Sequence, residues 1–118
     1  MKKDDKIFLE HVLESINKIE KTKNGLTKDQ FENNNCDVLD STLRRLEVIG
    51  EAIKNISQEL KNKYPEVEWK RIIGTRDILI HAYFSVDMEI IWDIVSNKLP
   101  ELKRTINKIL NELENNKK

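Results

Sequence analysis

The chain has 118 residues, a length typical of one domain that buries a hydrophobic core without disulfides or metals. Charged side chains make up 36% of it, yet the 21 basic and 21 acidic residues cancel, which excludes a strong overall attraction to nucleic acid. One cysteine excludes an internal disulfide, and no signal-peptide pattern or apolar run of ~20 residues is present, so we expect a soluble cytoplasmic protein.

Apolar residues recur at helical spacing along almost the whole chain, and only two prolines and three glycines interrupt them, so we predict an all-α fold. The first helix should begin near Asp4 or Asp5, whose carboxylates can cap it. It should end before Asn24 and Gly25, which tolerate the left-handed conformation of a helix cap. Its predicted core stripe is Leu9, Val12, Ile16 and Ile19.

A short helix and then a long one are predicted next. Thr27, followed three residues later by Gln30, matches the capping-box pattern and should begin a short helical turn that carries Phe31. The long helix is predicted from about Asp37 to Lys61, and Pro65 should prevent its continuation. Its apolar residues, expected in the core, are Leu39, Leu43, Leu46, Ile49, Ile53, Ile56 and Leu60.

Two more helices complete the chain, the first from about Glu68 to Phe84. Asp87 can cap the last helix, while Val86 packs against Ile91 as a hydrophobic staple. The apolar spacing continues across Pro100, so we expect this proline to kink the last helix and not to end it. The predicted core residues of that helix are Met88, Ile91, Val95, Leu99, Leu102, Ile106, Ile109 and Leu113.

The connections between these helices are short, and no repeat or linker separates them. Amphipathic helices joined in this way predict a single antiparallel up-and-down helical bundle over residues 1–118, with four main helices and one short helix. Charges between the apolar stripes, such as Glu47 and Glu51, are expected on a solvated face with weak ion pairs. Trp69 and Trp92 are expected as core anchors.

The segment RDILIHAYF, residues 76–84, places Arg76, Asp77, His81 and Tyr83 in the most apolar part of the chain. On a helical wheel with about 100° per residue, Tyr83 lies within about 20° of Arg76, and His81 lies within about 40° of Asp77. Apolar residues occupy the opposite half of this helix and also lie between the polar ones. A helix apolar on both sides needs a cover on both sides, and a second copy of the chain about a two-fold axis is the simplest one.

Arg76 and His81 lie about 7.5 Å apart along such a helix, within reach of one phosphate. A guanidinium offers forked donors to phosphate oxygens, and an imidazole exchanges protons near neutral pH. On RNA, His81 could take the 2′-hydroxyl proton while Arg76 stabilises the charge on phosphorus, without a metal or other cofactor, and Asp77 could orient the imidazole. The same residues also fit a structural role, as a buried ion pair or a histidine that bonds to a carboxylate, with the Tyr83 hydroxyl at the rim. The spacing leaves the functional and the structural interpretations open.

Other chemistries find less support in the sequence. His11 is the only other histidine, and the usual spacings of zinc ligands are absent. The three glycines form no phosphate-binding loop, and no serine or cysteine lies in a nucleophile motif.

Arg76, His81 and Tyr83 form an RxxxxHxY pattern, and the blocks RRLEVIGEAIKNIS, KYPEVEW and VDMEIIWDIVSNKLPELK surround it in order. Over nearly its whole length the chain resembles the HepT-like proteins of the HEPN superfamily, toxin partners of minimal nucleotidyltransferases. The resemblance implies an all-helical homodimer that acts as a metal-independent ribonuclease toxin, with Arg76 and His81 at an RNA-cleaving site in the dimer cleft. It also implies a nucleotidyltransferase antitoxin that transfers AMP to Tyr83.

One position departs from the family pattern. The residue after the motif arginine is often asparagine, whereas this chain has Asp77, whose charge repels RNA unless it is paired with Arg76 or His81. Basic residues elsewhere could form a local rim for RNA: Arg44, Arg45, Lys70, Arg71, Lys98, Lys103 and Arg104. Two other function classes stay open, a non-catalytic adaptor that presents a substrate to the nucleotidyltransferase and a helical dimerisation module.

Overall fold

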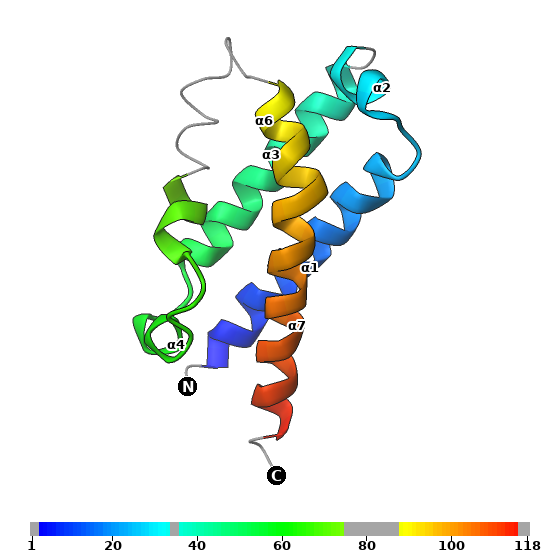
Figure 1. The fold of residues 1–118 in the computed structure, drawn as a ribbon. Helices are drawn as coiled ribbons and strands as arrows, with labels where there is room; N and C mark the ends of the chain where they lie inside the picture. The colour runs from blue at the N-terminus through cyan, green and yellow to red at the C-terminus, as the bar shows by residue number, and fades with distance from the viewer. Residues whose placement is uncertain (1–2, 34–35, 75–87, 116–118) are drawn as a thin grey trace.

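The computed structural model describes residues 3–33, 36–74 and 88–115, which are helical or connect helices and include no strand, in agreement with the predicted fold class. The elements are α1 (Lys3–Lys23), α2 (Lys28–Asn33), α3 (Cys36–Lys54), α4 (Gln58–Lys63), a helical segment over residues 69–74, α6 (Met88–Asp93), the π-helical segment η2 (Ile94–Lys98) and α7 (Leu99–Asn115). In Figure 1, α3 runs back beside α1, and α7 lies against α1.

The core is formed by the predicted apolar stripes of α1, α3 and the last helix. Phe31 of α2 and Leu60 of α4 join it and are 1% exposed. All predicted core residues with a described side chain are buried: Leu9, Val12, Ile16, Ile19, Leu43, Leu46, Ile49, Ile53, Ile56, Leu60, Ile91, Val95, Leu99, Leu102, Ile106, Ile109 and Leu113. The side chains of Leu39 and Met88 lie outside the described residues. The helical spacing of apolar residues therefore predicted the core correctly.

The first turn of α1 uses its acidic residues differently from the prediction. Asp4 and Asp5 both lie inside the helix, so neither caps it, although their charges favour the positive end of the helix dipole. Asp4 is exposed, whereas Asp5 is only 1% exposed. The Asp5 carboxylate accepts hydrogen bonds from the main-chain N–H of Ser57 at 2.8 Å and from its hydroxyl at 2.6 Å. Asp5 therefore joins α1 to a distant part of the chain.

The other end of α1 lies where the sequence predicted it, but its cap is different. No residue in the described part of the chain has a positive φ, so neither Asn24 nor Gly25 adopts the left-handed conformation. Instead, the N–H of Asn24 donates to the carbonyl of Glu20, and that of Leu26 donates to the carbonyl of Lys23, each at 2.8 Å. These bonds satisfy two of the carbonyls in the last turn of the helix without a left-handed residue.

The capping box at the start of α2 is confirmed. The Gln30 main-chain N–H donates to the Thr27 hydroxyl at 3.1 Å, and the Thr27 N–H donates to the Gln30 side-chain oxygen at 3.0 Å. This reciprocal pair supplies acceptors for donors that would otherwise lack a partner at the helix start.

The predicted long helix from Asp37 to Lys61 is interrupted, so that prediction was wrong in one respect. The chain leaves the helix at Asn55, and Ser57 begins α4 as its N-cap by accepting the N–H of Leu60 at 3.2 Å. The bonds from Ser57 to Asp5 hold the interruption in place. Since Ile56 and Leu60 are buried on both sides of the break, apolar spacing alone did not reveal it.

Replacement of Asp5 by alanine should lower the free energy of unfolding by about 2 kcal/mol, because two Ser57 donors would lose a charged acceptor in a partly buried place. Asp4→Ala is the matched control, since Asp4 precedes it in the same turn and is exposed. Urea unfolding followed by circular dichroism should separate the two variants. Equal midpoints would show that the Asp5 bonds contribute little.

The last helix continues through Pro100, as predicted. Its irregularity is the π-helical segment η2, where the N–H of Leu99 donates to the carbonyl of Ile94, five residues earlier. This wider turn precedes the proline, which has no N–H to donate and disturbs the regular ladder. The predicted cap at Asp87 and the staple at Val86 lie outside the described residues.

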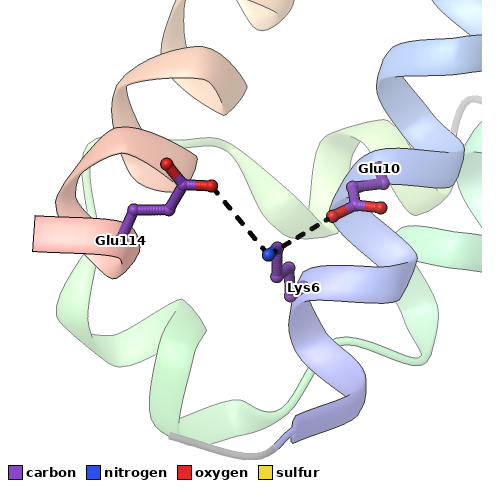
Figure 2. Close-up of polar contacts among 3 residues, drawn as sticks. All are labelled: Lys6, Glu10 and Glu114. Atoms are coloured by element: carbon purple, nitrogen blue, oxygen red, sulfur yellow. Dashed lines mark ion pairs between the residues drawn. The ribbon is translucent and has the colours of Figure 1, made fainter. Parts of the chain in front are cut away.

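Ion pairs at the surface join α1 to α7. The Lys6 ammonium of α1 lies 3.9 Å from the carboxylate of Glu114 in α7. It lies at the same distance from Glu10, one turn along α1, and Figure 2 shows both pairs. A second pair, from Lys103 to Glu20, has an N–O distance of 2.9 Å and is less exposed. Isolated pairs of this kind contribute little each, so apolar burial holds the two helices together.

Candidate functional site

The predicted site residues Arg76, Asp77, His81 and Tyr83 lie outside the described residues. Described chain borders them on both sides, with residues 69–74 before them and α6 after them. Contacts with the rest of the fold hold these two bordering segments.

The segment before the motif is fixed by Trp69. Its side chain is 6% exposed, and its indole N–H donates to the main-chain carbonyl of Tyr64 at 3.0 Å. Ile72 and Ile73 pack partly buried against the core. The helix begins within one residue of the predicted start at Glu68, and Trp69 is a core anchor, as predicted.

Tyr64 connects this segment to α7. Its side chain is 4% exposed, and its hydroxyl donates to the carboxylate of Glu112 in α7. Its carbonyl accepts from Val67 N–H at 3.2 Å as well as from Trp69. Burial, then the hydrogen bond and the negative charge of Glu112, raise the pKa of the Tyr64 hydroxyl to about 12. Tyr64 is thus a neutral donor at physiological pH.

The raised pKa of Tyr64 predicts a loss of stability at high pH. In the unfolded chain the phenol ionises near its ordinary pKa of 10.0, whereas the folded protein keeps the proton until about pH 12. The unfolded state binds fewer protons between these values, so the free energy of unfolding should fall as pH rises. Urea unfolding from about pH 9 to 12 should show a steeper fall for the parent than for a Tyr64→Phe protein. Parallel curves would contradict this assignment.

The segment after the motif is held by Trp92 of α6. This partly buried side chain packs on the core, and its ring centroid lies 5.3 Å from that of Phe31 in α2. The Lys23 ammonium lies 5.3 Å from the centre of the same ring, a cation–π distance. Trp92 therefore anchors α6 against α2, although less deeply than Trp69 is anchored.

The seven basic residues predicted to form a rim all belong to the described part of the chain. Arg45 and Lys103 are half-buried, and the other five are exposed. Two of the seven are held in ion pairs, Lys103 with Glu20 at 2.9 Å and Arg71 with Glu68 at 3.1 Å. These pairs lower the positive charge that the set can offer to a polyanion.

The described residues offer little for other chemistries. His11 is exposed on α1, and among residues 3–33, 36–74 and 88–115 no group of three or more His, Cys, Asp or Glu side chains could hold a metal ion. An open depression on α1 is lined by Glu10, Leu13, Glu14, Asn17, Lys18 and Lys21, all from that one helix. Its Lys18 lies 3.0 Å from Glu14, and this hydrogen bond and charge hold the pKa of Glu14 below its ordinary value. Such a pair is a surface contact within one helix, not a reaction site.

Comparison with protein families identifies the family to which the sequence around the motif is similar. A model of the family described as "Ribonuclease HepT-like" matches residues 12–109, a range that includes the whole motif segment. The chain belongs to the HepT-like ribonuclease family. The resemblance seen in the sequence is thereby confirmed at the level of the family.

Several proteins described as RNases are similar to this HepT-like chain. "Putative RNase MJ0127" of Methanocaldococcus jannaschii is 43% identical over 113 residues, which cover 96% of this chain and 93% of that protein. "Probable ribonuclease HepT" of Thermococcus cleftensis is 39% identical over 111 residues, covering 92% and 98%. "Gamma-glutamylcyclotransferase and putative RNase MJ0434" of M. jannaschii is 45% identical over 99% of this chain, but the chain spans 52% of that protein. No solved structure gives a significant match.

Sequence reasoning missed the contacts that hold the segment before the HepT-like motif in this chain. The bond between Tyr64 and Glu112 and the bond from Trp69 to the Tyr64 carbonyl were not predicted. A partial signal was present, because buried tyrosine and tryptophan need partners for their O–H and N–H groups. Which acceptors they find depends on how the helices pack.

None of the helices in the described residues is long and apolar enough to cross a membrane.

Proposed function

We propose that this chain is a metal-independent ribonuclease that cuts RNA with Arg76 and His81. The observation that carries the proposal is the RxxxxH spacing of these two residues, within the range that the HepT-like family model matches. The names of the relatives, which describe RNases, support the same substrate.

In the proposed mechanism, His81 accepts the proton of the RNA 2′-hydroxyl as that oxygen attacks the adjacent phosphorus. Arg76 donates to the non-bridging phosphate oxygens, where negative charge increases in the transition state. Asp77 accepts a hydrogen bond from the imidazole and orients it. The 5′-oxygen of the next nucleotide leaves and takes up a proton, so the products are a 2′,3′-cyclic phosphate and a 5′-hydroxyl end.

The biological setting that we propose is a two-gene toxin and antitoxin system in the cytoplasm. The active form is a homodimer in which the motif helices face each other across a cleft. The antitoxin is a nucleotidyltransferase that transfers AMP from ATP to the Tyr83 hydroxyl, with release of pyrophosphate. The anionic AMP then pairs with Arg76 and blocks the position of the scissile phosphate.

The direct test is incubation of the purified protein with RNA in excess EDTA. We expect cleavage that yields cyclic-phosphate ends, detected by mass spectrometry. Fragments that appear only when a divalent cation is added would contradict the metal-independent mechanism. A protein that binds the nucleotidyltransferase but cuts no RNA would instead support the adaptor function.

A further inference from the structure

The connection between α1 and α2, which Figure 1 shows at an edge of the fold, contains Asn24 followed directly by Gly25. This is the only Asn–Gly pair in the chain, and both residues are exposed. The main-chain N–H groups of Asn24 and Leu26 donate to carbonyls in the last turn of α1. The described residues supply no such acceptor for the Gly25 N–H and no hydrogen-bond partner for the Asn24 side chain.

The conformation of Gly25 does not itself require a glycine. Its φ is not positive, and a Cβ added there would meet only the carbonyl oxygen of Thr22, at an ordinary contact distance of 3.9 Å. What glycine contributes here is therefore chemical. No Cβ shields its main-chain nitrogen, and the backbone around it rotates easily, so the nitrogen can approach the side-chain carbonyl of Asn24.

We propose that Asn24 is a site of spontaneous deamidation in the folded protein. The Gly25 nitrogen attacks the side-chain carbonyl carbon of Asn24, and a new C–N bond closes a five-membered succinimide ring. The proton of that nitrogen leaves with the side-chain amide group as ammonia. Water then opens the ring at either of its two carbonyls, which gives aspartate or isoaspartate, and no oxidation or reduction takes place.

Deamidation would place a new negative charge at the carboxyl end of α1. The helix dipole is negative there, and the basic Lys21 and Lys23 of the last turn suit it, so a carboxylate at position 24 is unfavourable. That carboxylate also competes for the ammonium of Lys23, which lies 5.3 Å from the centre of the Trp92 ring in α6. The contact between α1 and α6 should therefore weaken.

Isoaspartate has a second effect, because the main chain then runs through the former side chain and gains a methylene group. Leu26 follows closely, packs partly buried against the core and donates its N–H to the Lys23 carbonyl at 2.8 Å. Thr27 then begins α2 through its bonds with Gln30. A longer main chain cannot keep all of these contacts, so the isoaspartyl form should be less stable than the parent.

The test is incubation of the folded full chain in mildly alkaline heavy-oxygen water, which marks every carboxylate formed during the incubation. Cleavage after glutamate releases the fragment between Glu20 and Glu32 for mass spectrometry. We expect conversion at Asn24 to be at least about tenfold faster in the parent than in a Gly25→Ala protein, in which a Cβ shields the nitrogen. Asn17, exposed on α1 but followed by Lys18, is the internal control and should convert much more slowly.

The effect on stability is measured on the same samples. Urea unfolding should show a lower midpoint for the incubated parent than for the fresh one, and no change for the incubated Gly25→Ala protein. An Asn24→Asp protein carries the charge without the longer main chain, so its midpoint should lie between those of the fresh parent and the isoaspartyl form.

Conversion of the parent in urea serves as the positive control of the assay. An unchanged Asn24 in the folded protein would mean that the turn keeps the two groups apart, and it would overturn the proposal. Equal conversion of the parent and the Gly25→Ala protein would also overturn it, because glycine would then have no part in the reaction. Conversion without any fall in the midpoint would support the site and overturn the weakened contact between α1 and α6.

Discussion

His81→Ala should lower the rate of RNA cleavage about 100- to 10,000-fold, because the 2′-hydroxyl would lose its general base. Alanine offers no group that accepts this proton near neutral pH. The measurement is the initial rate of cleavage in EDTA at saturating RNA, with circular dichroism to establish that the variant is folded.

The chain contains its own control for this experiment. His11 is the only other histidine and is exposed on α1, so His11→Ala should cleave RNA at the parent rate. If both alanine variants lost activity equally, the loss would reflect a general effect of the substitutions and His81 would not be the base. A His81→Ala protein as active as the parent would contradict the proposed mechanism.

Tyr83→Phe should abolish AMP transfer completely, since phenylalanine has no oxygen to attack the α-phosphorus of ATP. The parent, incubated with the cognate nucleotidyltransferase and ATP, should gain the mass of AMP and lose its RNA cleavage. Intact-mass spectrometry and a cleavage assay of the same samples measure both effects.

The control for this experiment is Tyr64, the other tyrosine of the chain. The chain has two tyrosines, and the side chain of Tyr64 is 4% exposed with its hydroxyl bonded to Glu112. An antitoxin cannot reach such a group, so Tyr64→Phe should be labelled as fully as the parent. Labelled Tyr83→Phe protein, or a Tyr64→Phe protein that takes up no AMP, would refute the assignment to Tyr83.

Apolar spacing predicted the helical bundle because it reflects burial directly. The stripe from Leu9 to Ile19 in α1 and the stripe across Pro100 are both buried as expected. Local polar patterns were also informative where both partners lie within one turn, as in the bonds between Thr27 and Gln30. Such signals need no knowledge of how the helices pack.

Contacts between distant residues could not be predicted in the same way. Ser57 bonds to Asp5 at a separation of 52 residues, and Tyr64 bonds to Glu112 at a separation of 48. Each polar residue alone looks like a surface side chain or a helix cap, so the break before α4 was missed. The candidate site itself was predicted from the Arg76 and His81 spacing together with the family resemblance, and it stays a prediction.

The ion pairs between the first and last helices also bear on how the protein is made. Lys6 contacts Glu114, and Glu20 contacts Lys103, so α1 gains these contacts only after α7 has been synthesised. Until α7 has left the ribosome, the apolar side chains of α1 that pack on α7 remain exposed to chaperones and to other nascent chains. A HepT-like chain stopped by a premature stop codon before α7 should therefore aggregate or be degraded.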